Sequence, residues 1–420
     1  MHILWVKMGG LWPLTSGGRL RSFNIVNELA RHHDVSVLTT HGDGEDPQEL
    51  ALQLEHCRRV ESFPFEAVKW RSPGFPLVLA RSWLSSLPVD LWKCQVPALR
   101  RRVRELLDSG EVDLCVADFL FAVPNLPFDR RVSTVFFAHN VEHLILQRLC
   151  RAQKRPWHRL PLEIEWRKER RYEAQVCRKA NLTVAVSPDD RRLFERMAPE
   201  ARIGDMPTGV DVDYFAPGKG AQGSPRKTAE LVFTGSMDWY PNEDAIRYFI
   251  ADILPLVRRE VPEIGVAVVG RNPSRRLSEE GMAAQVSVTG SVPDVRPYMD
   301  DASVYVVPLR IGGGTRLKIF EALAMGKAVV STSIGVEGLP LRDGEHFIRA
   351  DDPQAFAEAV IALQRDPGRQ RELGAAGRRL MVERYGWGQV AGEFARYCET
   401  AFKSSAHATA RTTEAVFRSQ

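Results

Sequence analysis

The chain has 420 residues, of which 44% are hydrophobic and 26% charged, as is usual for a soluble globular protein of two or more domains. Its net charge of +4 is too small to indicate nucleic acid as a partner. The six Cys residues are scattered without a Cys-x-x-Cys pair, which excludes a zinc cluster of that type and predicts a reducing, cytosolic location. No run reaches the roughly 18 uncharged apolar residues of a membrane span, and the first residues predict a strand rather than a secretory signal.

The first half of the chain alternates short apolar runs with helical patterns. Residues 2–6 predict a buried strand, and residues 16–32 predict a helix with Phe23 and Val26 on its apolar face. Further β-branched runs predict strands over residues 35–40, 112–118, 133–139 and 182–187. Strands of this kind, separated by helices, predict a parallel sheet covered on both faces.

Residues 63–92 are rich in Trp, Phe, Leu and Pro, with interspersed Arg and Lys. A basic, aromatic surface of this kind can lie on an anionic membrane or hold an apolar acceptor. Alternatively, the segment is a helical excursion that packs on its own domain, with Arg stems covering apolar surface. The sequence leaves both interpretations open.

Strand and helix patterns begin again at Leu231 and predict a second doubly wound α/β domain. Its expected strands occupy residues 231–236, 265–270, 286–292, 303–309 and 328–332. The predicted organisation is an N-terminal domain (1–205), a second domain (206–385), a C-terminal helix (386–402) and a disordered tail (403–420). Ligands of such sheets bind beyond the carboxyl ends of the strands.

The segment from Val306 to Gly338 carries the strongest chemical signal. An apolar strand is followed by three glycines, a helix start with two cations and a second apolar strand. Bare backbone N–H groups and the positive end of a helix dipole bind anions, so this segment predicts a site for a sugar carried on a diphosphate. Glu321 follows within reach of a sugar hydroxyl. The expected cradle consists of Gly312, Gly313, Gly314, Thr315, Arg316, Leu317 and Lys318.

The run EALAMGKAVVST (321–332) resembles the donor-binding segment of the retaining glycosyltransferases of family four, which have the GT-B fold of two facing Rossmann-like domains. Glu321 matches the second Glu of the family's pattern, which binds the ribose of the nucleotide. Gly313 stands where the first Glu, which contacts the donor sugar, is expected. The resemblance therefore implies a nucleotide-diphosphate sugar as donor, no metal and no further cofactor, and leaves the sugar open.

Other strand-end loops resemble the same family. Gly17 and Gly18 match a glycine pair beside the donor diphosphate, and His139 matches a His that contacts the donor sugar. Asp118 and Asn140 are acceptor-side candidates, although each residue type also serves as a cap or turn residue. The His139–His143 pair would bind a metal only within a helix, and no third ligand is apparent. The residues expected along the nucleotide are Gly235, Ser236, Arg271 and Val292.

The resemblance implies a retaining hexosyltransferase acting on a glycan, lipid-linked or small-molecule hydroxyl, in the cytoplasm or at the inner face of the membrane. Arg316 and Lys318 would stabilise the leaving diphosphate, and His139 the sugar. Two alternatives stay open. One is a GT-B epimerase, with Asp118 and Glu142 as its nearby carboxyls, or a phosphorylase. The other is a binding subunit whose donor site has degenerated at Gly313.

Overall fold

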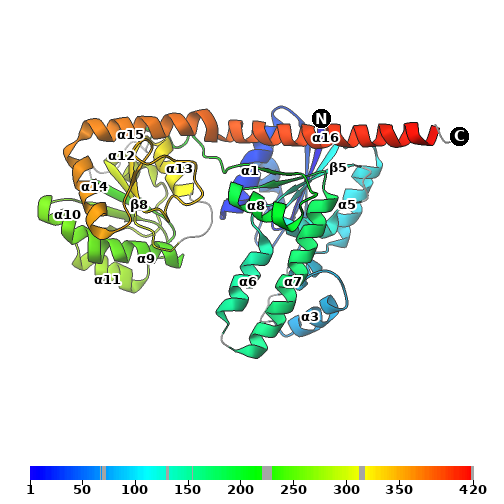
Figure 1. The fold of residues 1–420 in the computed structure, drawn as a ribbon, viewed down its shortest axis with the longest axis horizontal. Coiled ribbons are helices and arrows are strands. Elements are labelled where there is room, and N and C mark those ends of the chain that lie inside the picture. The colour runs from blue at the N-terminus through cyan, green and yellow to red at the C-terminus, as the bar shows by residue number, and fades with distance from the viewer. Residues whose placement is uncertain are drawn as a thin grey trace. The chain divides into compact units, whose positions relative to one another are not determined.

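The computed structural model describes residues 1–66, 68, 72–128, 132–153, 155–219, 229–311 and 317–417. The chain divides into two compact units (Figure 1). Unit 1 comprises residues 1–207 and 390–420, and unit 2 comprises residues 208–389. Each unit is built on one parallel sheet and is described by itself below.

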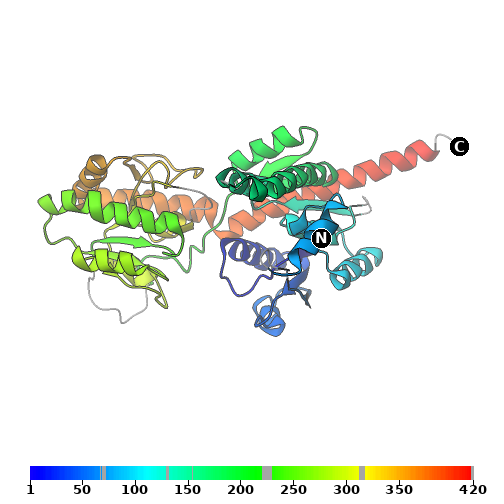
Figure 2. The same cartoon turned by 90° about the horizontal axis from the view of Figure 1, so that it is seen from below.

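Unit 1 contains a seven-stranded parallel sheet with the order β3-β2-β1-β4-β5-β6-β7. Its central strands are buried on both faces, because apolar side chains point to either side and helices cover them (Figure 2). The register places Lys7 of β1 beside Asp118 of β4, and Asp118 beside Phe137 of β5. The strands are β1 (His2–Lys7), β2 (Asp34–His41), β3 (Arg59–Pro64), β4 (Leu114–Asp118), β5 (Ser133–Phe137), β6 (Leu182–Ala185) and β7 (Ile203–Asp205).

The helices of unit 1 flank this sheet, and α6, α7 and α3 extend beyond it at one end (Figure 1). Helix α6 packs along α7, so the two form an antiparallel hairpin. The helices are α1 (Gly17–Ala30), α2 (Pro47–Gln53), α3 (Phe75–Trp83), α4 (Val89–Trp92), α5 (Pro97–Asp108), the 3-10 helix η1 (Leu120–Asn125), α6 (Glu142–Ala152), α7 (Pro156–Lys179) and α8 (Pro188–Met197).

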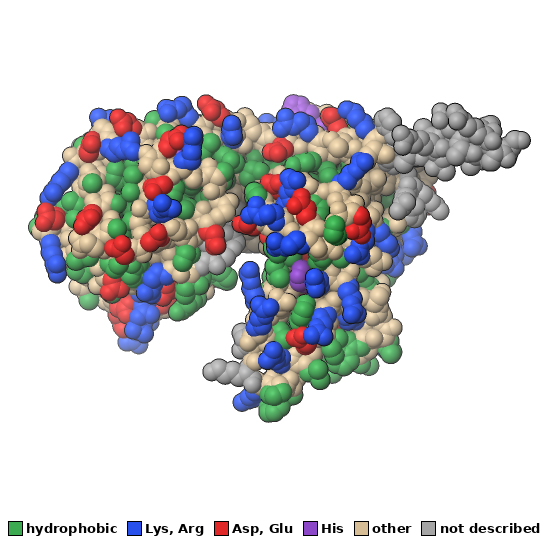
Figure 3. All heavy atoms as spheres, viewed as in Figure 1, with side chains coloured by type: hydrophobic (Ala, Val, Ile, Leu, Met, Phe, Trp, Pro, Cys, Tyr) green, Lys and Arg blue, Asp and Glu red, His purple; other side chains and the backbone are tan. Residues whose placement is uncertain are grey.

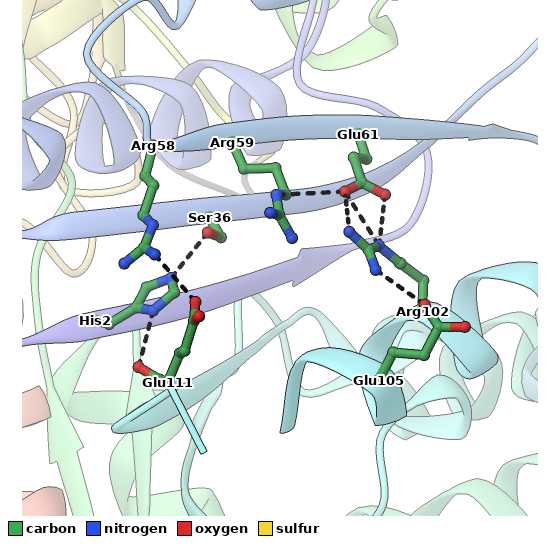
Figure 4. A network of polar contacts seen from close by, with 8 residues as sticks. All are labelled: His2, Ser36, Arg58, Arg59, Glu61, Arg102, Glu105 and Glu111. Carbon is green, nitrogen blue, oxygen red and sulfur yellow. Dashed lines mark hydrogen bonds and ion pairs between the residues drawn. The ribbon is translucent and has the colours of Figure 1, made fainter. Parts of the chain in front are cut away.

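Polar contacts hold the amino ends of the unit 1 strands together (Figure 4). The His2 ring lies 2.9 Å from Ser36 Oγ through Nε2 and 2.9 Å from the Glu111 carbonyl oxygen through Nδ1. Arg102 of α5 donates through Nε and Nη2 to the Glu61 carboxylate of the edge strand β3. This end of the sheet is therefore structural, and the carboxyl ends of the strands remain for a ligand.

Unit 2 contains a six-stranded sheet with the order β10-β9-β8-β11-β12-β13. Its strands are β8 (Leu231–Thr234), β9 (Val266–Val269), β10 (Ser287–Val288), β11 (Val304–Val307), β12 (Ala328–Ser331) and β13 (Ile348–Arg349). Its helices are α9 (Tyr240–Tyr248), the π-helix η2 (Phe249–Ile253), α10 (Leu254–Glu260), α11 (Arg275–Ala283), α12 (Arg296–Asp301), α13 (Leu317–Ala324), α14 (Pro353–Arg365), α15 (Pro367–Leu380) and the π-helix η3 (Met381–Tyr385).

The last helix, α16 (Trp387–Phe417), begins in unit 2 and belongs to unit 1 from Val390 onward. Phe394 is fully buried in unit 1, with its ring centroid 5.3 Å from that of Trp5 and 5.0 Å from that of Phe137. The helix continues to Phe417, whereas the composition predicted disorder from Lys403. Residues 403–417 contain Ala but neither Gly nor Pro, so nothing in the segment stops the helix.

Candidate functional site

Strands β8 and β9 of unit 2 end in loops that touch through two glycines. A Cβ on Gly270 would lie 1.8 Å from the carbonyl oxygen of Gly235, and one on Gly235 would lie 2.6 Å from Lys318 Nζ. A side chain at Gly270 would meet backbone, and one at Gly235 would displace the Lys318 and Asn242 side chains. The absence of Cβ atoms therefore brings the β8 loop, the β9 loop and the start of α13 together at the carboxyl ends of the strands.

Lys318, in the first turn of α13, is held over the end of β8. Its Nζ donates to Asn242 Oδ1 at 2.7 Å and lies 4.0 Å from the ring centroid of Phe233. Asn242 in turn donates through Nδ2 to the carbonyl oxygen of Ser236 at 2.8 Å. The ammonium group is therefore oriented by protein contacts, and it adds a full charge to the positive end of the α13 dipole.

Ser236 and Arg271 meet across the two strand-end loops. Arg271 Nε donates to Ser236 Oγ at 2.7 Å, and this hydroxyl donates to Asp238 Oδ1 at 2.5 Å. Asn272 donates to the other oxygen of Asp238 at 3.1 Å. Hydrogen bonding from Ser236 and Asn272 lowers the pKa of Asp238. Val292 packs, partly buried, against the core of unit 2.

Glu321 lies one turn beyond Lys318 on α13 and is partly buried. Burial raises the pKa of Glu321 to about 7, although the nearby Lys318 charge opposes the shift. The carboxyl is therefore divided between its two protonation states near neutral pH. The remaining predicted cradle residues, Gly312, Gly313, Gly314, Thr315 and Arg316, lie outside the described residues, and Leu317 begins α13 directly after them.

In unit 1, Asp118 is the fully buried last residue of β4. Its Oδ2 accepts a hydrogen bond from Trp5 Nε1 at 2.9 Å and lies 3.4 Å from Lys7 Nζ. Its Oδ1 lies 2.8 Å from His139 Nε2, although the two groups are out of line for a hydrogen bond. Burial alone would raise the pKa of Asp118, but Lys7 and His139 hold it well below its usual range. Protein groups enclose this carboxylate, and its predicted acceptor contact stays a prediction.

His139 follows β5 and is buried beneath Phe119. Its Nδ1 lies 3.4 Å from Arg21 Nη1, and its Nε2 faces Asp118. Burial lowers the pKa of His139 to about 3, although the Asp118 charge opposes the shift. Both ring nitrogens face protein groups, and the expected contact with a donor sugar stays a prediction.

Gly17 and Gly18 are the first residues of α1, which Ser16 caps by accepting from the Arg19 N–H at 3.3 Å. A Cβ on Gly18 would lie 2.7 Å from Phe119 Cζ. Gly18 therefore lets the helix start pack against the aromatic ring that covers His139. Arg19 is turned toward Glu45, with Nη2 and Oε1 2.5 Å apart.

Asn140 is exposed and donates to Glu142 Oε1 at 3.3 Å, and burial raises the pKa of Glu142 to about 7. His143 Nδ1 lies 2.5 Å from Glu173 Oε2, while His139 faces Asp118. The two histidines therefore have different partners and do not form the metal-binding pair weighed from their spacing. Across the described ranges, no group of three or more His, Cys, Asp or Glu side chains is arranged to hold a metal ion.

Four residues contact the predicted site residues without having been predicted from the sequence: Lys7, Arg21 and Phe119 in unit 1, and Asn242 in unit 2. Lys7 had one usable signal, since it ends an otherwise apolar strand. Asn242 is the third residue of α9, after Tyr240 and Pro241, and Phe119 is one of many aromatic residues. Their roles depend on strand register and on helix packing, which a local sequence pattern does not specify.

Two family profiles match the chain and together cover most of it. The profile described as Glycosyltransferase Family 4 matches residues 16–214, and the profile described as Glycosyl transferases group 1 matches residues 228–366. A phosphatidyl-myo-inositol mannosyltransferase of Mycobacterium tuberculosis (strain H37Rv) is 32% identical over 234 residues, which are 53% of this chain and 60% of that protein. The Mycobacterium leprae protein of the same name is 27% identical over 72% of this chain and 78% of its own.

Solved structures share the fold of both units. Sucrose-phosphate synthase of Thermosynechococcus elongatus matches with a TM-score of 0.67 and 16% identity, over 96% of this chain and 99% of its own. The Anabaena protein HepE in complex with UDP-glucose matches with a TM-score of 0.60 and 15% identity, over 95% of this chain and all of its own. At these identities the likeness shows the fold alone, and it confirms the predicted GT-B class with two Rossmann-like parallel sheets.

Proposed function

Because this chain belongs to glycosyltransferase family 4, we propose that it moves a hexosyl unit from a nucleotide-diphosphate sugar to an acceptor hydroxyl, with retention at the anomeric carbon. The observation that carries the proposal is the arrangement around α13. There Lys318 is oriented by Asn242 over the end of β8, and Glu321 follows one turn later on the same helix.

This arrangement suits the charge that develops during transfer. Cleavage of the bond to the donor sugar leaves a diphosphate with growing negative charge, and preorganised cations stabilise such charge where it forms. Lys318 supplies one cation, and Arg316 with the backbone of Gly312, Gly313 and Gly314 would supply the rest of the cradle. The ionised form of Glu321 would accept hydrogen bonds from the ribose hydroxyls. Arg271, Ser236 and Val292 would line the remainder of the nucleotide.

The unit 1 cluster would act as a rigid support rather than as a set of direct contacts. Asp118 and Arg21 face the two nitrogens of His139, and Phe119 covers the ring. We propose that this stack fixes the start of α1, where the family resemblance places Gly17 and Gly18 beside the donor diphosphate. Asn140, which is exposed, remains the candidate for an acceptor contact.

Donor and acceptor are proposed from the relatives. One mycobacterial relative is named a phosphatidyl-myo-inositol mannosyltransferase, another a GDP-mannose-dependent phosphatidylinositol monomannoside mannosyltransferase, and HepE was solved with UDP-glucose. GDP-mannose and UDP-glucose are therefore the first donors to test, with a lipid-linked hydroxyl as acceptor. Among the described helices, none combines the length and the apolar character needed to cross a bilayer. We propose a cytoplasmic protein that reaches such an acceptor from the membrane surface, without a metal or further cofactor.

An epimerase would need carboxyl groups that reach the sugar. Asp118, one of its two candidates, is fully buried and surrounded by Trp5, Lys7 and His139. The burial of this carboxylate favours transfer over epimerisation.

The test is donor hydrolysis and binding by the full chain. UDP-, GDP-, ADP- and TDP-sugars are incubated with the protein, and nucleotide release is followed with and without EDTA. We expect slow release from one donor, unchanged by EDTA and lost in Glu321→Ala and Arg316→Ala. Arg275→Ala serves as the matched control, because that side chain is 92% exposed on α11. No release and no thermal shift with any nucleotide would refute the proposed donor site and favour a binding subunit.

A further inference from the structure

Helices α3, α6 and α7 carry an outer surface where large apolar side chains and cations occur together. The three helices lie at the same end of unit 1, beyond its sheet (Figure 1), and Figure 3 shows hydrophobic side chains and Lys or Arg side by side on that end. We call this the tip surface and define it by its exposed large hydrophobic residues. These are Leu77, Trp83, Leu84, Ile145, Leu149, Trp157 and Leu160.

The apolar exposure of the tip surface is large. Leu84 is 91% exposed, Trp157 68% and Leu160 63%. Apolar surface left in water forgoes about 25 cal/mol per Å² of burial, and contiguous exposed patches in monomeric proteins usually mark an interaction site. Helix α3 is apolar along most of its length, yet among its residues only Phe75 and Ser82 are buried.

Charges on the same helices are separated by sign. The carboxylates of Glu165, Glu169 and Glu173 on α7 are at most 2% exposed. Glu163 is partly buried and lies 2.6 Å from Arg167 Nη2. Residues 72–89, which include α3, contain no acidic residue. The exposed cations around the tip surface are Arg81, Arg148, Arg151, Arg155 and Arg159.

The buried carboxylate of Glu165 explains how α3 is held in place beside α7. Glu165 accepts hydrogen bonds from Trp83 Nε1 at 2.8 Å and from the Val89 N–H at 2.6 Å, so it joins α3 and α4 to α7. Lys168 Nζ adds a bond to the Ser82 carbonyl oxygen at 2.9 Å. The bonds from Trp83 and Ser82 hold the C-terminal end of α3 against α7, while most apolar side chains of α3 stay outside the core.

We propose that the tip surface docks this protein on an anionic lipid bilayer, with its apolar side chains at the headgroup level and its Arg side chains at lipid phosphates. Charge complementarity selects this occupant. A surface on which exposed Arg side chains outnumber the part-exposed Glu163 carboxylate fits an anionic interface, whereas a second copy of the chain would bring like charges together. The inference deepens the proposed function, because docking there would give access to a lipid-linked acceptor, but the binding does not require donor turnover.

Co-sedimentation of the full chain with vesicles tests the proposal. We expect binding to vesicles of phosphatidylcholine with phosphatidylglycerol, no binding to phosphatidylcholine alone, and release at high salt. The double variant Arg155→Ala with Arg159→Ala removes two cations that each contribute to binding of an anionic surface. Its partitioning to the anionic vesicles is expected to fall roughly 30-fold. The pair Leu84→Ser and Leu160→Ser is expected to weaken it at least roughly tenfold. The matched control is Leu52→Ser with Met282→Ser, side chains that are 76% and 80% exposed on other helices, and it should bind like the parent.

Three results would overturn the docking proposal. They are absence of binding to the anionic vesicles, binding by the tip variants that equals that of the parent, and lipid-free self-association that the tip variants abolish. Donor hydrolysis, measured in parallel without lipid, keeps the two proposals separate. If hydrolysis is intact but the protein does not bind vesicles, only the docking proposal is contradicted. If the protein binds vesicles but hydrolyses no donor, the proposed transferase function is contradicted and the docking proposal stands.

Discussion

Phe119 stacks on His139, with ring centroids 3.8 Å apart and ring planes inclined by 13°. The backbone of Phe119 has φ 69° and ψ 157°, a conformation that costs a non-glycine residue about 1–3 kcal/mol. Lys7 Nζ also lies 4.1 Å from the centroid of the Phe119 ring. The fold keeps a strained residue at the end of β4, and the strain places an aromatic ring over the buried histidine.

Comparison of Phe119→Gly with Phe119→Ala distinguishes the effect of the strained backbone from the effect of losing the ring. Phe119→Gly should relieve the strained backbone, so the free energy of unfolding should fall less than in Phe119→Ala, which loses the ring and keeps the strain. Turnover should fall in both, by roughly tenfold if the stack contributes about 1.4 kcal/mol. Urea unfolding and donor hydrolysis measure the two effects. Equal unfolding free energies of the two variants would contradict the claim that the Phe119 backbone is strained.

Gly18→Ala should disturb the same ring from the other side. The added Cβ would lie 2.7 Å from Phe119 Cζ, and overpacking of this kind costs about 1–3 kcal/mol of stability. The double variant Gly18→Ala with Phe119→Leu should recover part of that loss, because the smaller side chain makes room. A double-mutant cycle by thermal or urea unfolding measures the coupling, and additive effects would show that the two residues do not meet.

Asp118→Asn should leave the Lys7 ammonium buried without its counter-charge. Removing one partner of a buried ion pair costs about 3–5 kcal/mol. Adding Lys7→Met removes the unpaired cation and should restore stability, but not turnover, since His139 still lacks its anionic neighbour. Thermal unfolding and kcat/KM are measured on both variants. Recovery of turnover together with stability would show that Asp118 acts through folding alone.

Lys318→Ala should lower kcat by roughly 100- to 1,000-fold, as expected for loss of one oriented group, worth about 2.7–4 kcal/mol, facing developing charge. Asn242→Ala should have a smaller effect of about tenfold, because the cation remains and loses only its 2.7 Å hydrogen bond. Steady-state kinetics with the active donor give both values. A larger effect from Asn242→Ala than from Lys318→Ala would contradict this division of roles.

Glu321→Gln should change how stability depends on pH. The folded-state pKa of Glu321, about 7, lies above its ordinary value, so the folded state holds the proton more tightly than the unfolded state between these pH values. The unfolding free energy of the parent should therefore fall as pH rises through that window, relative to the variant, and the difference should be constant above it. Urea unfolding at several pH values measures the difference in unfolding free energy between parent and variant. A difference that does not change with pH would show that the folded-state pKa of Glu321 is not raised.

The central strands could be predicted from the sequence because each is buried on both faces and reads as a continuous apolar run. The edge strands β3, β7 and β13 were not predicted. Strand β3, with the sequence RVESFP, is polar and contains Pro, as edge strands tolerate. Strands β7 and β13 have three and two residues, too few to show a pattern.

The positions of Gly235 and Ser236 after β8, and of Lys318 and Glu321 on α13, follow from local patterns, because the carboxyl ends of parallel strands meet at one edge. The environment of Asp118 does not follow from a local sequence pattern. Its partners Trp5 and Lys7 are more than 100 residues away in sequence and reach it through the register of β1 against β4. The burial of His139 depends in the same way on a ring and a helix from other segments.

Helix α16 has a consequence for the order in which the protein can be made. Phe394, Cys398 and Ala401 are buried in unit 1, yet they come after the whole of unit 2 in the chain. A ribosome therefore releases all the sequence of unit 2 before the sheet that begins at His2 can close its core around Phe394. During synthesis, unit 2 is the first unit to be complete, and a nascent chain that stops before Phe394 carries an N-terminal sheet with Trp5 and Phe137 lacking their final neighbour.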